Sequence, residues 1–134
     1  MGILSRLFSD PAFDVFSAHP GREEAARYGR LPVPGEATLE LPAALVRIYY
    51  EVDRGASSTF HPPSDLVVEV HDASGVEVPI RKKLPHGRAS RRTWGGAGRT
   101  YVGRIEVPRP GAYVVTARRT AVGIHENPRV CLGE

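Results

Sequence analysis

Cysteine is almost absent from this sequence, since Cys131 is the only one in 134 residues. A single thiol cannot form a disulfide within the chain or supply a four-cysteine zinc site. Long apolar runs are missing too: the longest are the size of a strand, whereas a transmembrane helix needs about 18 apolar residues. Residues 1–8 lack the continuous apolar stretch and cleavage site of a signal peptide. We therefore expect no disulfide scaffold and no membrane span, and we take a cytoplasmic location as the default.

Acidic residues are absent from one long stretch, between Glu77 and Glu106. Residues 1–78 hold six arginines and twelve Asp or Glu, whereas residues 79–134 hold twelve Lys or Arg and three Glu. If the two halves interleave in one domain, many of these charges pair across strands. If they do not, the basic half is left to attract an anionic partner.

The residue patterns of common enzymes and metal sites are also missing. The five histidines are scattered and form no metal-binding spacing: His19, His61, His71, His86 and His125. The glycines at 95–98 are followed neither by a Gly-Lys-Ser/Thr motif nor by a helical pattern, which argues against a phosphate-binding loop. We expect a protein that is not an enzyme, with no catalytic residue, no cofactor and no bound metal. Cys131 is expected to be a small buried apolar residue.

From residue 36 onward apolar and polar residues alternate, as in strands that bury one face. Val46, Ile48, Tyr50 and Val52 are the clearest case. Further short segments of this kind occur at 39–41, 66–71, 76–80, 101–107, 113–117 and 130–132. The sequence predicts one all-β domain, an antiparallel β-sandwich of about seven strands with immunoglobulin-like or related Greek-key connections. Predicted inward positions are Val46, Ile48, Val68, Val70, Val78, Ile105, Tyr113 and Val115.

Turn residues predict how the strands are joined. Residues 72–75 (Asp-Ala-Ser-Gly) predict a hairpin in which Gly75 takes positive φ. Pro79 predicts that the second strand is an edge strand or ends there. Residues 108–111 (Pro-Arg-Pro-Gly) predict a second hairpin. Residues 84–98 contain five prolines or glycines, and we predict a flexible loop.

The first 35 residues differ from the rest because proline and glycine interrupt them repeatedly. We predict an N-terminal arm over 1–35 with short helical turns, one of them near 23–28, and a sandwich domain over 36–134. The apolar residues of the arm are expected to cover an edge of the sandwich or to mediate self-association.

The segment 110–113 (Pro-Gly-Ala-Tyr) resembles the entry to a late strand in bacterial immunoglobulin-like modules. Over residues 44–118 the wider pattern is similar to small domains of actinobacterial envelope-associated proteins. The resemblance implies a sandwich in which Tyr113 is buried and its hydroxyl bonds near the preceding turn. It also implies envelope association as an alternative location, and it carries no catalytic residue. The chain departs from antibody-type domains in having no cysteine pair and in placing Trp94 in a predicted loop.

The acid-free stretch supplies the candidate binding residues: Arg81, Lys82, Lys83, Arg88, Arg91, Arg92, Trp94 and Arg99. A basic loop attracts phosphate groups, and Trp94 is suited to stack on a base or to enter a lipid interface. Alternatively, these charges face water or pair with the acidic half. We predict a non-catalytic interaction module that binds another protein. The alternative is an anion-binding module that contacts nucleic acid or acidic lipid through the basic loop 81–99.

Overall fold

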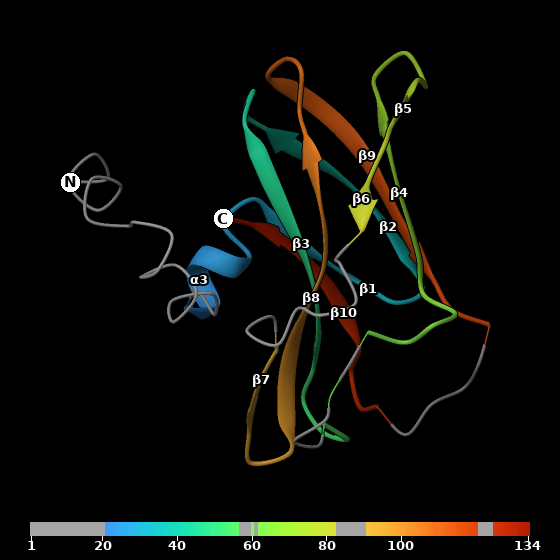
Figure 1. The fold of residues 1–134 in the computed structure, drawn as a ribbon. Coiled ribbons are helices and arrows are strands. Elements are labelled where there is room, and N and C mark those ends of the chain that lie inside the picture. Colours follow the sequence, from blue (N-terminus) through green and yellow to red (C-terminus); the bar gives the residue numbers. More distant parts are fainter. Residues whose placement is uncertain (1–20, 57–59, 61, 83–90, 121–124) are drawn as a thin grey trace, which may run out of the picture.

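The chain forms an antiparallel β-sandwich, as the alternation predicts (Figure 1). The computed structural model describes residues 21–56, 60, 62–82, 91–120 and 125–134. In chain order the elements are α3 (Arg22–Ala25), β1 (Gly29–Pro32), β2 (Gly35–Leu41), β3 (Leu45–Val52), β4 (Val67–Asp72), β5 (Glu77–Val78), β6 (Arg81–Lys82), β7 (Arg91–Trp94), β8 (Ala97–Glu106), β9 (Gly111–Arg118) and β10 (Arg129–Gly133).

The strands divide between two sheets. Sheet A has the order β1-β10-β3-β8-β6, and sheet B has the order β2-β9-β4-β5. Strand β8 is long enough to pair with β6 near Gly103 and with β7 at Ala97–Thr100, so β6 and β7 occupy one edge in line. Strand β1 forms the opposite edge of sheet A, so the sheet begins within the residues predicted as an arm.

The pairing follows one long folded hairpin. β1 pairs with β10, β2 with β9, β3 with β8 and β4 with β5, all antiparallel. The sequence left open whether the strands are joined as in an immunoglobulin domain or as in a related Greek key. The observed pairing is the second of these, in its jelly-roll form. The predicted hairpin at 108–111 is wrong, because β8 lies in sheet A and β9 in sheet B. That turn carries the chain from one sheet to the other.

The core lies between the sheets and contains the inward residues that the alternation predicts. Seven of these residues are buried, namely Val46, Ile48, Val70, Val78, Ile105, Tyr113 and Val115, and Val68 is partly buried against them. β-Branched side chains dominate this core, which suits the pleated surface of two packed sheets. Gly75 has a φ of 89°, and β5 ends at Val78, directly before Pro79, as predicted.

The predicted loop over 84–98 is wrong for its last part. Residues 91–94 form β7, and Gly95 and Gly96 close a two-residue turn with φ values of 56° and 87°. Positive φ at both positions is the type I′ geometry that suits a tight hairpin. The remainder of that segment, 84–90, lies outside the described residues. So do residues 1–20 of the predicted arm, and the division at residue 35 remains a prediction.

The helical turn predicted near 23–28 corresponds to α3. Ala25 is buried against Tyr49 and Cys131 on the outer face of sheet A. The helix therefore covers the part of this face that β3 and β10 form, and it does not cover the part near β6.

Candidate functional site

Three arginines lie side by side on the outer face of sheet A. Arg47 on β3 pairs in register with Arg104 on β8, and Arg104 pairs with Arg81 on β6. Neighbouring strands are about 4.8 Å apart, so the three side chains start from one straight line across the sheet. Arg47 and Arg81 are exposed, and Arg104 is half-buried. We call these three residues the arginine row.

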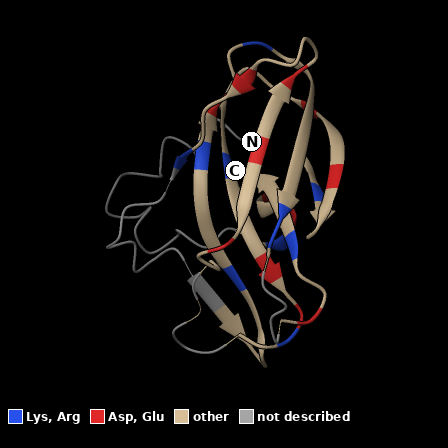
Figure 2. Cartoon of the chain, turned by 90° about the vertical axis from the view of Figure 1, so that its right-hand side faces the viewer, with Lys and Arg blue, Asp and Glu red and all other residues tan. Residues whose placement is uncertain are grey.

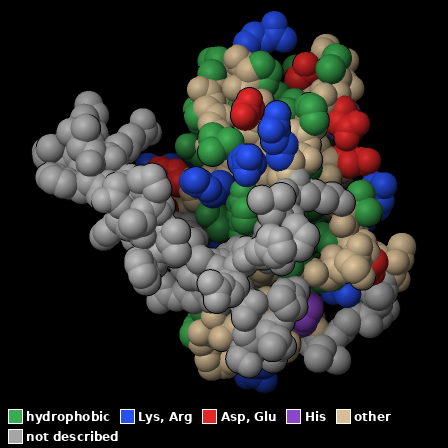
Figure 3. Space-filling model, viewed as in Figure 1, with side chains coloured by type: hydrophobic (Ala, Val, Ile, Leu, Met, Phe, Trp, Pro, Cys, Tyr) green, Lys and Arg blue, Asp and Glu red, His purple; other side chains and the backbone are tan. Residues whose placement is uncertain are grey.

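The arginine row has no carboxylate partner among the described residues. The ion pairs of this part of the chain involve Arg27, Arg30, Arg54, Arg99, Arg118, Arg119 and Arg129 and none of the three. Like charges directly opposite each other on a sheet are destabilising. Figure 3 shows basic side chains gathered on this face of the molecule. The row costs folding energy, and an anion bound over it would offset the repulsion.

A second charged group on the same face is fully paired. Glu51 is only 1% exposed, and the guanidinium groups of Arg99 and Arg129 approach its carboxylate to 3.2 Å and 2.7 Å. Arg129 also bonds Asp53 at 2.9 Å. Register explains the cluster, because Glu51 stands opposite Arg99 on one side and Arg129 on the other. These charges hold the strands together and are not available to a ligand.

The predicted basic site does not form one loop. Arg81 and Lys82 lie on β6, whereas Arg91, Arg92 and Trp94 lie on β7. Lys83 and Arg88 lie outside the described residues. The two groups pair with different parts of β8, from Gly103–Arg104 to Ala97–Thr100, so they are about 10 Å apart at the nearest and about 23 Å at the farthest at 3.3 Å per residue. Arg99 is 3% exposed and belongs to the Glu51 cluster.

Trp94 is exposed at the tip of the β7–β8 hairpin. Its side chain is 43% exposed, and the guanidinium carbon of Arg99 lies 5.6 Å from the ring centroid. This distance is typical of a cation–π contact. One side of the indole therefore packs against Arg99, whose guanidinium is paired with the buried Glu51.

Sequence reasoning missed Arg47 and Arg104. Arg47 stands at an outward position of a recognisable strand, and Arg104 lies three residues beyond Tyr101. Their alignment with Arg81 depends on the pairing of β8 with both β3 and β6, strands that are distant from it in the sequence. The alternation of apolar and polar residues predicts that each arginine faces outward. It does not predict that the three lie in one row, because that depends on the register between distant strands.

A second group of hydrogen-bonded polar side chains surrounds Tyr50 near the end of β3. Arg119 donates to the Tyr50 hydroxyl at 3.2 Å and to Asp65 at 3.1 Å, and the Tyr50 hydroxyl lies 2.8 Å from His125 Nδ1. The hydroxyl of Tyr50 therefore links the Arg119 guanidinium to the His125 imidazole. Burial and the charge of Arg119 lower the pKa of His125. Phe60 stacks on Tyr50 and meets His125 edge-on, so the group joins three segments of the chain.

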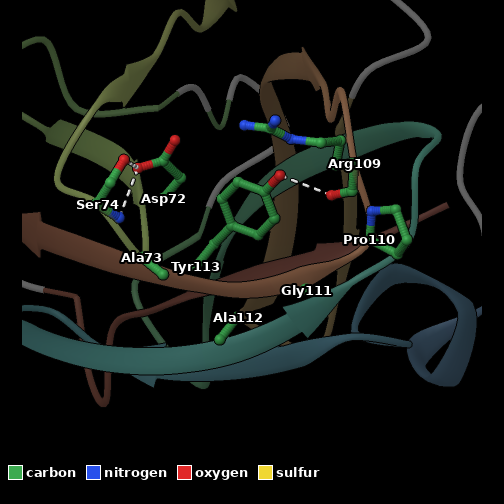
Figure 4. A pocket seen from close by; sticks show the side chains of 8 residues that line it. All are labelled: Asp72, Ala73, Ser74, Arg109, Pro110, Gly111, Ala112 and Tyr113. Carbon is green, nitrogen blue, oxygen red and sulfur yellow. Dashed lines mark hydrogen bonds between the residues drawn. The ribbon is translucent and has the colours of Figure 1, made fainter.

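The described residues contain a shallow depression of about 270 Å³ between two turns (Figure 4). Asp72 is committed there to its own turn, because it accepts hydrogen bonds from Ser74 and Val76 that lower its pKa. Tyr113 is 3% exposed and donates to the Arg109 carbonyl at 2.6 Å, which confirms the geometry predicted for this tyrosine. Only Arg109 offers an uncommitted charge, too little to define a ligand site.

Nucleophilic and metal chemistry find little support in this part of the chain. Burial raises the pKa of Cys131 to about 12, so its thiol stays protonated at neutral pH, and the residue is fully buried as predicted. Within the described ranges no three His, Cys, Asp or Glu side chains come together as metal ligands. No helix in those ranges has the length and apolar character that spanning a membrane requires.

Three comparisons with known proteins give no relative from which a function could be transferred. No protein-family model, no curated protein and no solved structure matches this chain.

Proposed function

We propose that this chain is a non-catalytic binding module that docks an acidic protein surface onto the arginine row. The observation that carries the proposal is the cross-strand alignment of Arg47, Arg104 and Arg81 without a carboxylate partner among the described residues. On the same face Glu51 is paired with Arg99 and Arg129, and Glu106, two residues after Arg104 on β8, forms no ion pair with the row. An acidic surface on another protein supplies the negative charge that offsets the repulsion among the three arginines.

The surroundings of the row favour a protein partner. Leu45 is 40% exposed two residues before Arg47 on the same face, and Tyr101 is partly exposed two rows away. Arginine and tyrosine are enriched at protein interfaces. The row stands on a sheet face, whereas single-stranded nucleic acid is usually bound in a basic groove with aromatic platforms.

The alternative is an anion-binding module for nucleic acid or acidic lipid centred on the β7–β8 hairpin. The exposed ring of Trp94 is the observation that favours it. Stacking on a base or insertion into a headgroup region would use this ring together with the basic residues of 81–99. The two proposals centre the ligand on different parts of β8, the first on the row at Arg104 and the second on the hairpin turn after Trp94.

The test is fluorescence anisotropy with three probes: labelled polyglutamate, a short single-stranded oligonucleotide and vesicles containing phosphatidylserine. We expect polyglutamate to bind, with an affinity that falls as salt rises. The double variant Arg47→Gln/Arg104→Gln should weaken that binding by about tenfold, since each exposed charge contact contributes up to about 1 kcal/mol. The matched control Arg54→Gln/Arg109→Gln has the same net charge and should bind like the wild type.

Equal weakening in both double variants would mean that net charge, and not the row, binds the probe. The alternative gains support if the oligonucleotide or the vesicles shift Trp94 fluorescence and the row variant leaves that shift intact. Replacing Arg88, Arg91 and Arg92 with Ser should then abolish the shift.

A further inference from the structure

The outer face of sheet B carries the opposite charge. Its outward positions include four glutamates, Glu36, Glu40, Glu69 and Glu77, and a single arginine, Arg118. Arg118 pairs with Glu69 at 3.5 Å, and no ion pair of the described residues uses Glu36, Glu40 or Glu77. Figure 2 shows acidic positions along the strands on this side of the molecule.

The two faces share one spacing. Glu36 on β2 and Glu69 on β4 both stand opposite Thr116 on β9, so they are two strand spacings apart. Arg47 and Arg81 both stand opposite Arg104, and they are separated in the same way. Each separation is therefore about 9.6 Å, twice the distance between neighbouring strands.

We propose that copies of this chain associate with the arginine row of one molecule on the acidic face of the next. The proposal rests on the proposed function and names its partner, a second copy of this chain. Charge complementarity and the common strand spacing argue for this occupant. Glu36 and Glu40 are available on the edge strand β2, whereas Glu69 would have to exchange or share its contact with Arg118.

The geometry determines the form of the assembly. The two faces lie on opposite sides of the sandwich, so the contact joins different surfaces of the two molecules. Such heterologous contacts do not close into a dimer unless the rotation between copies brings the ends together. We therefore expect columns whose mean mass rises with protein concentration and has no plateau at two copies.

The contact should be weak. The strands of sheet B have 7, 8, 6 and 2 residues and span on the order of 360 Å² per partner. This is less than the roughly 800 Å² per partner of a stable interface. Side chains on both faces are also solvated when the molecules are apart. Association should therefore be reversible and strongest where the Debye length is long.

Sedimentation velocity tests the proposal with charge-reversed variants. Arg47→Glu/Arg104→Glu makes both faces acidic, and Glu36→Lys/Glu40→Lys makes both faces basic. We expect the wild type to associate in about 0.01 M salt and to be monomeric in about 1 M salt, where the Debye length falls from about 30 Å to about 3 Å. Each variant alone should stay monomeric in low salt, and an equimolar mixture of the two should associate again.

The control Arg54→Glu/Arg109→Glu has the net charge of the first variant and should associate like the wild type. A wild type that is monomeric in low salt overturns the proposal, and so does a mixture that stays monomeric while the wild type associates. Polyglutamate separates this failure from that of the proposed function. If the row binds polyglutamate and the chain stays monomeric, the acidic partner is another protein; if neither occurs, both proposals fail.

Discussion

Among single residues, Glu51 shows most directly how the fold uses its charges. The carboxylate is almost fully removed from water and faces the guanidinium groups of Arg99 and Arg129 from the two neighbouring strands, with that of Arg30 on β1 farther away at 3.9 Å. Removing one partner of a buried ion pair costs more than the pair contributes, because the other charge stays buried. Glu51 therefore fixes the register of three strands and makes the centre of sheet A sensitive to substitution.

Glu51→Gln should lower the free energy of unfolding by about 3 kcal/mol or more, since it removes the negative charge between Arg99 and Arg129. Urea unfolding followed by circular dichroism measures the change. The control Glu40→Gln, at an exposed position, should alter the free energy by less than about 0.5 kcal/mol. Equal effects of the two substitutions would contradict the importance of the buried pair.

Tyr113→Phe should lower the free energy of unfolding by about 0.5–1.5 kcal/mol, the net value of one hydrogen bond. The lost bond is the one from the hydroxyl to the Arg109 carbonyl at the turn between the sheets. Tyr101→Phe is the matched control, because the Tyr101 hydroxyl makes no hydrogen bond to any residue that the structure describes. A Tyr113 effect no larger than that of Tyr101 would show that the corner bond does not stabilise the fold.

His125 should make stability depend on pH in the mildly acid range. Its pKa is lowered in the folded chain by burial and by Arg119, so the unfolded chain binds more protons between that lowered value and about 6.5. The contribution of neutral His125 to the free energy of unfolding is therefore fully present above pH 6.5. It falls as the pH drops through this window and levels off below the pKa of the folded chain. Urea unfolding at a series of pH values should show this slope in the wild type but not in His125→Gln. A slope that persists in the variant would assign it to other groups.

Among the elements, the β7–β8 hairpin shows why a glycine-rich segment is ambiguous in sequence. Gly95 and Gly96 indicate flexibility when read alone. Between two extended segments the same pair is a strong signal for a type I′ turn. The strands between residues 45 and 78 were predictable because apolar and polar residues alternate in their sequence. The short strands β1, β6 and β7 were not, since their place depends on pairing with a distant strand.

Gly96→Ala should lower the free energy of unfolding by about 1–2 kcal/mol, because its φ of 87° disfavours any residue with a Cβ. The added methyl group would meet no atom within 4 Å, so the effect comes from the backbone alone. Thermal unfolding measures the change, with Gly95→Asn as the control, since Asn tolerates the φ of 56° at the first turn position. An unchanged melting temperature for Gly96→Ala would argue against the tight turn.

In the whole molecule, the charge difference between the two halves is largely resolved by interleaving. Five ion pairs of the described residues join an acid of the first half to an arginine of the second: Glu51–Arg99, Glu51–Arg129, Asp53–Arg129, Asp65–Arg119 and Glu69–Arg118. The sequence left open whether such pairs would form, and it did not indicate which charges would be left over. Which charged residues lack a partner depends on the sheet that each strand joins and on its register there. That information is nonlocal, and it is the reason why the arginine row could not be found before the fold.

The arginine row is the proposed binding site for an acidic partner. Amide chemical-shift mapping of the isotope-labelled chain with polyglutamate locates this contact residue by residue. We expect the largest shifts at Arg47, Arg104, Arg81 and their strand neighbours, and we expect them to disappear at high salt. Largest shifts at Trp94 and the β7–β8 turn, or around Arg109, with the row unchanged, would contradict this proposal.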